Sequence, residues 1–158
     1  MQPLSVKNLF RKDLYATENF HLSEKGSDFE FPDAINVSSI EGDVTVIKLE
    51  ETVSSKASLS ARATIICDRC LDNFDTVIPF SFELEYTLDR KGESADGLYV
   101  DKYGNIDLSE PVRDELILAI PTQNFCKVDC PGICPTCGHN LNHEPCQCII
   151  SEEITEGK

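Results

Sequence analysis

Eight cysteines carry the clearest chemical signal in this 158-residue chain. Six of them lie between residues 126 and 148. The first twenty residues contain no apolar signal region, so we expect a reducing compartment, in which stable disulfides are rare. Thiolate ligation of a metal ion is therefore the interpretation that we favour.

The spacing of the cysteines supports metal binding. Cys67–Cys70 and Cys134–Cys137 are both C-x-x-C motifs, from which two thiolates of one tight turn can reach a single ion at about 2.3 Å. Gly138 follows the second motif and permits a positive φ, so that backbone N–H groups can point at the sulfurs. Cys146–Cys148 adds a further close pair. We expect a tetrahedral zinc site from Cys134, Cys137, Cys146 and Cys148.

The other four cysteines leave two arrangements open. Cys67, Cys70, Cys126 and Cys130 can form a second four-cysteine site that ties the tail to the main body. Alternatively, one zinc is held by a mixed set and the other thiols are free. His139 and His143 lie inside the cluster and could each replace a cysteine. The sequence thus predicts one or two structural zinc ions.

A redox function of the first C-x-x-C motif is the competing interpretation. Arg69 would favour a thiolate there, as a reactive motif requires. A thioredoxin-like motif, however, opens a helix after a strand. The flanks of Cys67–Cys70 are predicted to be strands on both sides, which disfavours redox catalysis.

Two segments with period-two alternation predict these flanking strands. Apolar residues occupy every second position from Ala57 to Cys67, and again from Ile78 to Leu88, with polar residues between them. Both segments are typical of half-buried antiparallel strands. Their connection, Asp68–Asn73, places the first C-x-x-C motif at the tip of a long hairpin.

The remaining elements define the expected fold class. Val44–Leu49 is a further predicted strand, and Glu30–Val37 is a weaker one at a sheet edge because of Pro32. A helix is expected at 109–120, ended by Pro121. We therefore predict an α+β fold that is mainly β, an antiparallel meander or small barrel with one covering helix and a C-terminal zinc-binding, cysteine-rich tail.

The chain divides by composition into three parts. Residues 1–121 form the predicted β-rich domain, which opens with a short helix around Leu9. Residues 122–150 form the cysteine-rich zinc tail, which has too little apolar surface to fold without metal. Residues 151–158 are predicted to be a frayed terminus.

Charge and missing motifs limit the classes of function. The formal net charge is −14, which disfavours broad binding to nucleic acid and favours a basic protein partner. No stretch is apolar enough to span a membrane. Phosphate-binding loops, dinucleotide fingerprints and nucleophile elbows are missing, and an all-thiolate metal shell is structural rather than catalytic. The sequence therefore argues against an enzyme.

Several of these segments resemble the YceD family, the large ribosomal RNA subunit accumulation proteins. The resemblance covers about Thr45 to Cys148. The matching segments are the hairpin Cys67–Cys70, Ile106–Ser109, Val112–Pro121, Cys130–Asn142 and Cys146–Cys148. Because some members lack the cysteine-rich tail, the chain is similar to the tail-bearing bacterial or chloroplast branch.

The resemblance implies a role in ribosome biogenesis and in accumulation of large-subunit ribosomal RNA, in the bacterial cytoplasm or the chloroplast stroma. Combined with the acidity, it suggests an accessory factor that holds a basic ribosomal protein or a pre-ribosomal particle, with Glu83 and Glu85 as candidate contacts. The first alternative is a zinc module that binds RNA directly, through Lys127 and the amides near Cys134–Gly138. A thiol redox enzyme ranks third.

Overall fold

The computed structural model describes residues 1–32, 35–88, 98–144, 146 and 148. The chain separates into two compact units. The first comprises Met1–Ala63 and Val77–Ile120, and the second comprises Thr64–Thr76 and Pro121–Lys158. The hairpin tip that carries the first C-x-x-C motif thus belongs to the same unit as the tail. The predicted domain boundary at residue 121 stays a prediction.

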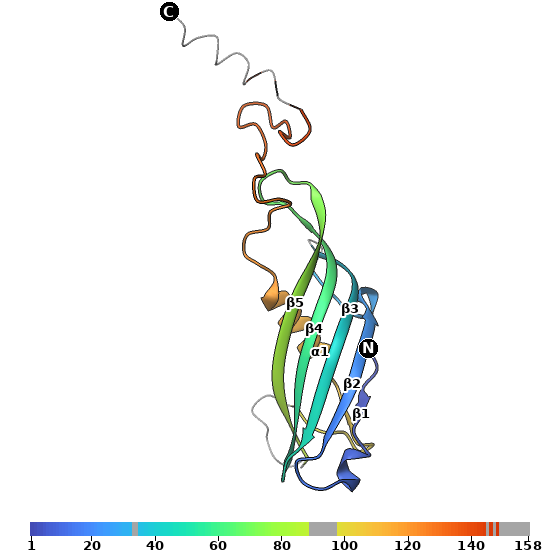
Figure 1. The fold of residues 1–158 in the computed structure, drawn as a ribbon. Helices are drawn as coiled ribbons and strands as arrows, with labels where there is room; N and C mark the ends of the chain where they lie inside the picture. The colour runs from blue at the N-terminus through green and yellow to red at the C-terminus, as the bar shows by residue number, and fades with distance from the viewer. Residues whose placement is uncertain (33–34, 89–97, 145, 147, 149–158) are drawn as a thin grey trace, which may run out of the picture. The chain divides into compact units, whose positions relative to one another are not determined.

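A four-stranded antiparallel meander dominates the fold, with its strands in the order of the sequence (Figure 1). The strands are β2 (Thr17–Lys25), β3 (Ile35–Lys48), β4 (Thr52–Ile66) and β5 (Asn73–Thr87). In the pairing of β2 with β3, Thr17 lies opposite Ile47 and Lys25 opposite Ser39. The mainly β, antiparallel fold class is confirmed.

Burial follows the predicted alternation along β4 and β5. The positions at every second residue from Ala57 to Cys67 are all buried, and Ser58, Arg62 and Ile66 between them are exposed. On β5 the buried residues are Ile78, Phe80, Phe82 and Tyr86. One face of each strand therefore lies in the apolar core.

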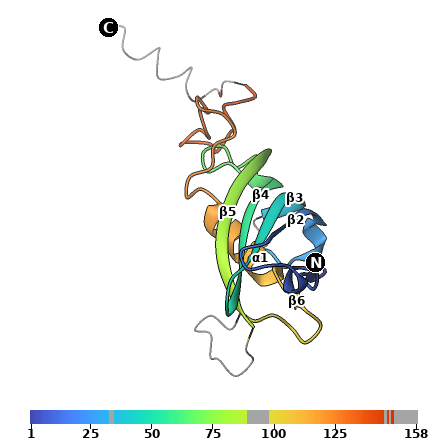
Figure 2. The ribbon, with the colours of Figure 1, turned by 60° about the horizontal axis from the view of Figure 1, so that its bottom comes forward.

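The helix α1 (Ser109–Ala119) lies against one face of the sheet in both views (Figures 1 and 2). Its buried side chains are Val112 and Leu116, which are spaced by one helical turn. At the start of the helix, the Asp107 carboxylate accepts hydrogen bonds from both the backbone N–H and the hydroxyl of Ser109, at 2.8 and 2.6 Å.

The first unit also contains four short elements. Strand β1 (Leu4–Ser5) pairs antiparallel with β6 (Asn105–Ile106) and is followed by the 3-10 turn η1 (Leu9–Arg11). A second 3-10 turn, η2 (Gly26–Asp28), connects β2 to β3. The short N-terminal helix predicted from the sequence is thus a strand and a single 3-10 turn.

The strand predictions before residue 50 were partly wrong. The two strands expected at Glu30–Val37 and Val44–Leu49 are replaced by the single long strand β3, whose described residues begin at Ile35. Strand β2 was not predicted at all, because Leu22 is its one buried residue and Phe20 is half-buried.

The predicted frayed terminus, 151–158, lies outside the described residues. Among the described residues, no helix combines the length and apolar character needed to cross a membrane.

Candidate metal centres

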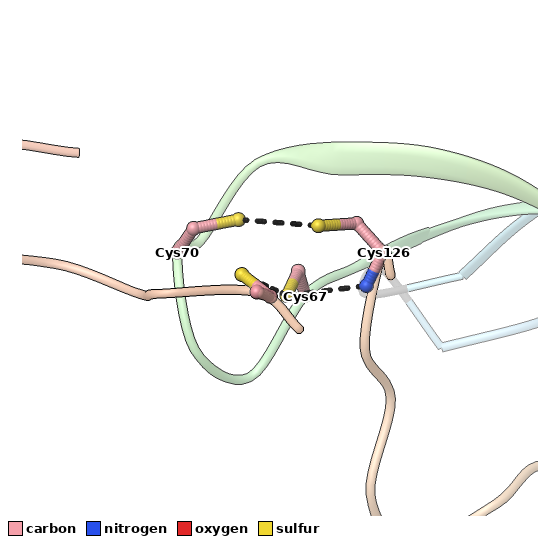
Figure 3. A group of neighbouring side chains, drawn as sticks. Cys67, Cys70 and Cys126 are labelled. Carbon is pink, nitrogen blue, oxygen red and sulfur yellow. Dashed lines mark hydrogen bonds between the residues drawn. The ribbon is translucent and has the colours of Figure 1, made fainter. Parts of the chain in front are cut away.

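The tip of the β4–β5 hairpin and the start of the tail bring four cysteines together. Their sulfur atoms all lie within 4.8 Å of one another. The group consists of Cys67, Cys70, Cys126 and Cys130. The Sγ atoms of Cys70 and Cys126 are 3.7 Å apart, and those of Cys67 and Cys130 are 3.9 Å apart. Figure 3 shows the side chains of Cys70 and Cys126 pointing at each other across this centre.

These distances match one tetrahedral ion. Four sulfurs that each lie about 2.3 Å from a central zinc are separated from one another by about 3.8 Å. Cys67 is fully buried, and Cys70 and Cys130 are nearly so. The first centre is therefore a closed group of four thiols, with the geometry of a structural site rather than of a site with an open position.

The two residues inside the first C-x-x-C motif hold the tail in place. The backbone N–H of Asp68 donates to the carbonyl of Asn124 at 2.8 Å, and the Asp68 carboxylate accepts from the Asn124 N–H at 2.6 Å. The Arg69 guanidinium donates to the Cys130 carbonyl at 3.2 Å and stacks 4.1 Å above the ring of Phe125. Arg69 therefore positions the segment that supplies the third and fourth sulfurs.

Further polar contacts connect the hairpin tip to the loop after Cys130. Asn140 donates its side-chain N–H to the Asp72 carboxylate at 2.6 Å. His143 lies 3.4 Å from the same carboxylate and is largely exposed. The Asn142 side chain donates to the Sγ of Cys130 at 3.4 Å, a contact that stabilises a thiolate.

The second centre lies wholly in the tail. Its sulfurs also all lie within 4.8 Å of one another, and its members are Cys134, Cys137, Cys146 and Cys148. The Gly138 N–H donates to the carbonyl of Cys134 at 2.9 Å, and Gly138 has φ 74°. The C-x-x-C-Gly sequence thus forms the tight turn expected for a pair of thiolate ligands.

The two C-x-x-C turns share the same backbone geometry. In the first turn the Leu71 N–H donates to the carbonyl of Cys67, again at 2.9 Å, and Leu71 has φ 63°. Leucine therefore occupies the left-handed position that glycine fills in the second turn. A bulky residue with positive φ is strained, and the Leu71 side chain is 63% exposed.

Ionisation of the first group is uneven. Burial disfavours the thiolate of Cys67, but hydrogen bonds from the backbone of Cys70, Cys126 and Arg69 outweigh it and lower the pKa of Cys67 to about 6. Burial and, after it, the neighbouring cysteine side chains together raise the pKa of Cys126 to about 12. The full set of four thiolates therefore needs a cation to balance its charge.

The second group repeats this pattern. Backbone hydrogen bonds from Cys137 and Thr136 lower the pKa of Cys134 to about 6. The hydrogen bond with the Cys137 side chain, followed by burial, raises the pKa of Cys148 to about 11. Each group thus contains at least one thiol with a lowered pKa and at least one with a raised pKa.

The structure assembles the tail set of four cysteines that the sequence analysis favoured, and also the second set of four that it left as one of two open arrangements. Among the described residues, both groups with metal-binding geometry contain cysteine alone, and neither His139 nor His143 belongs to them. Occupancy by a metal stays a proposal. Sequence reasoning missed the polar contacts of Asp68 and Asp72, although the Asp and Asn residues beside the cysteines were a signal for them.

Proteins similar to this chain are found in mycobacteria. Uncharacterized proteins of Mycobacterium bovis and Mycobacterium tuberculosis are each 31% identical over 109 residues, which is 65% of this chain and 52% of the relative. An uncharacterized protein of Mycobacterium leprae is 30% identical over 109 residues, covering 65% of this chain and 49% of the relative. The chain thus spans about half the length of the curated relatives that it matches.

No solved structure matches the chain. The family described as "Large ribosomal RNA subunit accumulation protein YceD" matches residues 55–155. This match includes β4 from residue 55 onward, the strand β5, the helix α1 and all eight cysteines. The chain therefore belongs to the YceD family.

Proposed function

We propose that this chain is a non-enzymatic accessory factor in biogenesis of the large ribosomal subunit, and that each group of four cysteines holds one structural zinc ion. The description of its family, which names accumulation of large-subunit ribosomal RNA and no catalytic activity, supports the first part. The two closed groups of sulfur atoms within 4.8 Å support the second. Those groups are the observation that carries the proposal.

Sulfur chemistry and size both favour zinc. Four thiolates in tetrahedral geometry select zinc or iron. A four-iron cluster needs its cysteine sulfurs much farther apart than the 3.7 and 3.9 Å found in the first group. A single ion fits these distances, and zinc is the usual occupant of all-cysteine structural sites. Bound zinc would supply folding free energy to the tail.

Charge favours a basic protein partner. The chain has a net charge of −14 with its thiols neutral. Each zinc with four thiolates adds a net −2, which takes the loaded protein to about −18. We propose that it holds a basic ribosomal protein or an assembly intermediate, in the bacterial cytoplasm or the chloroplast stroma. Glu83 and Glu85, exposed on the outer face of β5, are candidate contacts.

The alternatives receive less support. RNA binding by the tail was expected to use amides near Cys134, but the Cys137 and Thr136 N–H groups are directed at the Cys134 sulfur. A redox function needs an accessible thiolate. Cys67 has the lowered pKa that such chemistry requires, but its side chain is completely buried.

The metal proposal is tested by elemental analysis and X-ray absorption on the purified full chain. We expect two zinc ions per chain, each bonded directly to sulfur atoms alone. A folded chain that contains no metal, or a shell that includes nitrogen, would contradict the assignment of the eight cysteines.

The partner proposal is tested by pull-down of purified large-subunit ribosomal proteins with the zinc-loaded chain at physiological salt. We expect capture of a basic ribosomal protein and weaker capture by the double variant Glu83→Gln, Glu85→Gln. The matched control is Glu41→Gln, Glu50→Gln, which removes the same charge from other exposed positions. Tight binding to bare ribosomal RNA with no binding to any ribosomal protein would refute the proposal.

A further inference from the structure

A basic pocket of about 480 Å³ lies in the first unit of this acidic chain. Lys7, Arg11 and Lys102 line it and are all exposed. Among the described residues of the lining, Asp101 carries the one carboxylate. The other lining residues are Phe10, Leu88, Val100, Tyr103 and Gly104. The local charge is thus about +2, opposite in sign to that of the whole chain.

The fold brings these cations together from distant parts of the sequence. The pairing of β1 with β6 sets the N-terminal segment beside the turn at 101–104. The N–H of Val6 donates to the carbonyl of Gly104 at 2.9 Å. A Cβ on Gly104 would lie 2.8 Å from the Lys7 Cγ, so the Lys7 stem packs directly on this glycine. Close contact with the turn thereby fixes the position of Lys7.

The other two cations are also held on rigid turns. Lys48 donates its ammonium to the carbonyls of Phe10 and Lys12, at 3.2 and 2.7 Å, and so fastens the 3-10 turn that carries Arg11. The Asp101 carboxylate accepts hydrogen bonds from the backbone N–H groups of Tyr103 and Asn105, at 2.7 and 2.8 Å. Its role is to shape the turn that carries Lys102.

The three cations lack acidic partners among the residues that the structure describes. None of Lys7, Arg11 and Lys102 forms an ion pair there. Like charges gathered around one pocket repel each other, and an anion in the pocket would relieve that repulsion. The pocket is therefore built to receive negative charge.

An exposed aromatic ring adjoins the cations. Tyr103 is 58% exposed, and the Lys102 ammonium lies 4.8 Å from the centre of its ring. Phe10 adds a second ring to the lining. Basic side chains interleaved with aromatic rings are the pattern by which proteins hold single-stranded nucleic acid.

We propose that this pocket binds single-stranded RNA, with a backbone phosphate held by Lys7, Arg11 and Lys102 and a base stacked on Tyr103. The pocket volume falls within the range of about 300–1,000 Å³ typical of small-ligand sites, so it receives one nucleotide of a strand rather than the face of a duplex. An acidic peptide would satisfy the cations and leave the aromatic ring unused.

The phosphate contact is tested by titrating a fluorescent single-stranded RNA oligonucleotide with the full, zinc-loaded chain. Neutralising one phosphate of a single strand predicts that the affinity falls about threefold between 50 and 200 mM salt. The triple variant Lys7→Gln, Arg11→Gln, Lys102→Gln should bind weakly and lose this dependence. The matched control, with the same loss of charge, replaces Lys25, Lys56 and Arg62 by Gln and should bind like the unmodified chain. Equal loss in both triple variants, or no binding by the unmodified chain at 50 mM salt, would overturn the proposal.

The stacking contact is tested separately. Tyr103→Ala should weaken binding about tenfold, while Tyr103→Phe, which keeps the ring, should bind like the unmodified chain. A polyglutamate peptide should compete poorly with the oligonucleotide. Competition as strong as that of unlabelled RNA, or no effect of Tyr103→Ala, would show a site for acidic peptides and overturn the assignment to RNA.

This inference goes beyond the proposed function, and the two can fail independently. The partner proposal fails if no ribosomal protein is captured, whatever the RNA titration shows. The pocket proposal fails in the RNA titration, even if a ribosomal protein is captured. We expect the triple variant to retain capture of the ribosomal protein, since its substitutions remove no acidic group.

Discussion

Because Leu71 has a left-handed backbone, we predict that glycine is more stabilising than alanine at this position, which is the opposite of the general rule. In most positions glycine is less favourable than alanine by about 0.5–1 kcal/mol, because it loses more conformational entropy on folding. Leu71 has φ 63°, where a side chain costs about 1–2 kcal/mol relative to glycine. At this position, glycine should therefore be the better residue.

The comparison of Leu71→Gly with Leu71→Ala isolates this backbone effect, since both variants remove the leucine side chain beyond Cβ. The difference between the two costs predicts that the glycine variant is the more stable by about 0.5–1 kcal/mol. For a chain of this size that corresponds to a midpoint about 1–4 °C higher. Thermal unfolding of the zinc-loaded variants measures it.

Ser58 provides the control. It is exposed on β4 and has ordinary extended backbone, so Ser58→Gly should be less stable than Ser58→Ala by about 0.5–1 kcal/mol. A result in which glycine is the worse residue at both positions would refute the reasoning. It would show that the first C-x-x-C turn lacks the backbone geometry of the second.

Four further outcomes follow from the centres and the glycines. Zinc should dissociate as the pH falls through and below about 6, because Cys67 and Cys134 have pKa values lowered from 9 to about 6 and stabilise the fold only while ionised. A chromogenic chelator measures the released zinc. Full retention of zinc at pH 4 would contradict this prediction. Chelation at neutral pH should make the segment after residue 121 sensitive to protease, while the β-sheet circular dichroism remains; protection of that segment without metal would count against zinc-dependent folding. Gly138→Ala should cost about 0.5–1 kcal/mol in denaturant unfolding, since a Cβ there meets nothing within 4 Å and only the backbone resists. Gly26→Ala should cost several times more, because its Cβ would lie 1.8 Å from the Val37 carbonyl oxygen, and equal midpoints for the two variants would exclude that clash.

Alternation predicted β4 and β5 because both strands bury every second residue over a long run. The same signal is weak in β2, where Leu22 is the one fully buried side chain. In β3, Gly42 lies between the two strands that the sequence predicted and inside the single strand that the structure has. The structure shows a reason for that glycine, since a Cβ there would lie 2.3 Å from the carbonyl oxygen of Ser58 on the neighbouring strand. A close approach between strands has no signature in local sequence.

Spacing predicted the group of four cysteines in the tail, because a tight turn delivers a pair of thiolates and a four-cysteine centre needs two pairs. For the other four cysteines, spacing left two arrangements open. Spacing could not reveal how the pairs of the first centre meet. That depends on Asp68 and Arg69 contacting residues of the tail more than fifty positions away. Spacing also did not predict the strain at Leu71. The positive φ that Leu71 shares with Gly138 is found only by comparing the backbone angles of the two turns.

The net charge of the chain and the local charge around one pocket determine different aspects of binding. The value of −14 is a sum over all residues and governs how the protein meets a partner from a distance. At physiological salt, charges are screened beyond about 8 Å, so a bound group responds chiefly to the side chains beside it. Lys7 and Lys102 are ninety-five positions apart, and a scan for basic runs could not find the pocket that they share. An acidic chain can therefore present one basic contact to RNA while the rest of its surface remains suited to a basic protein.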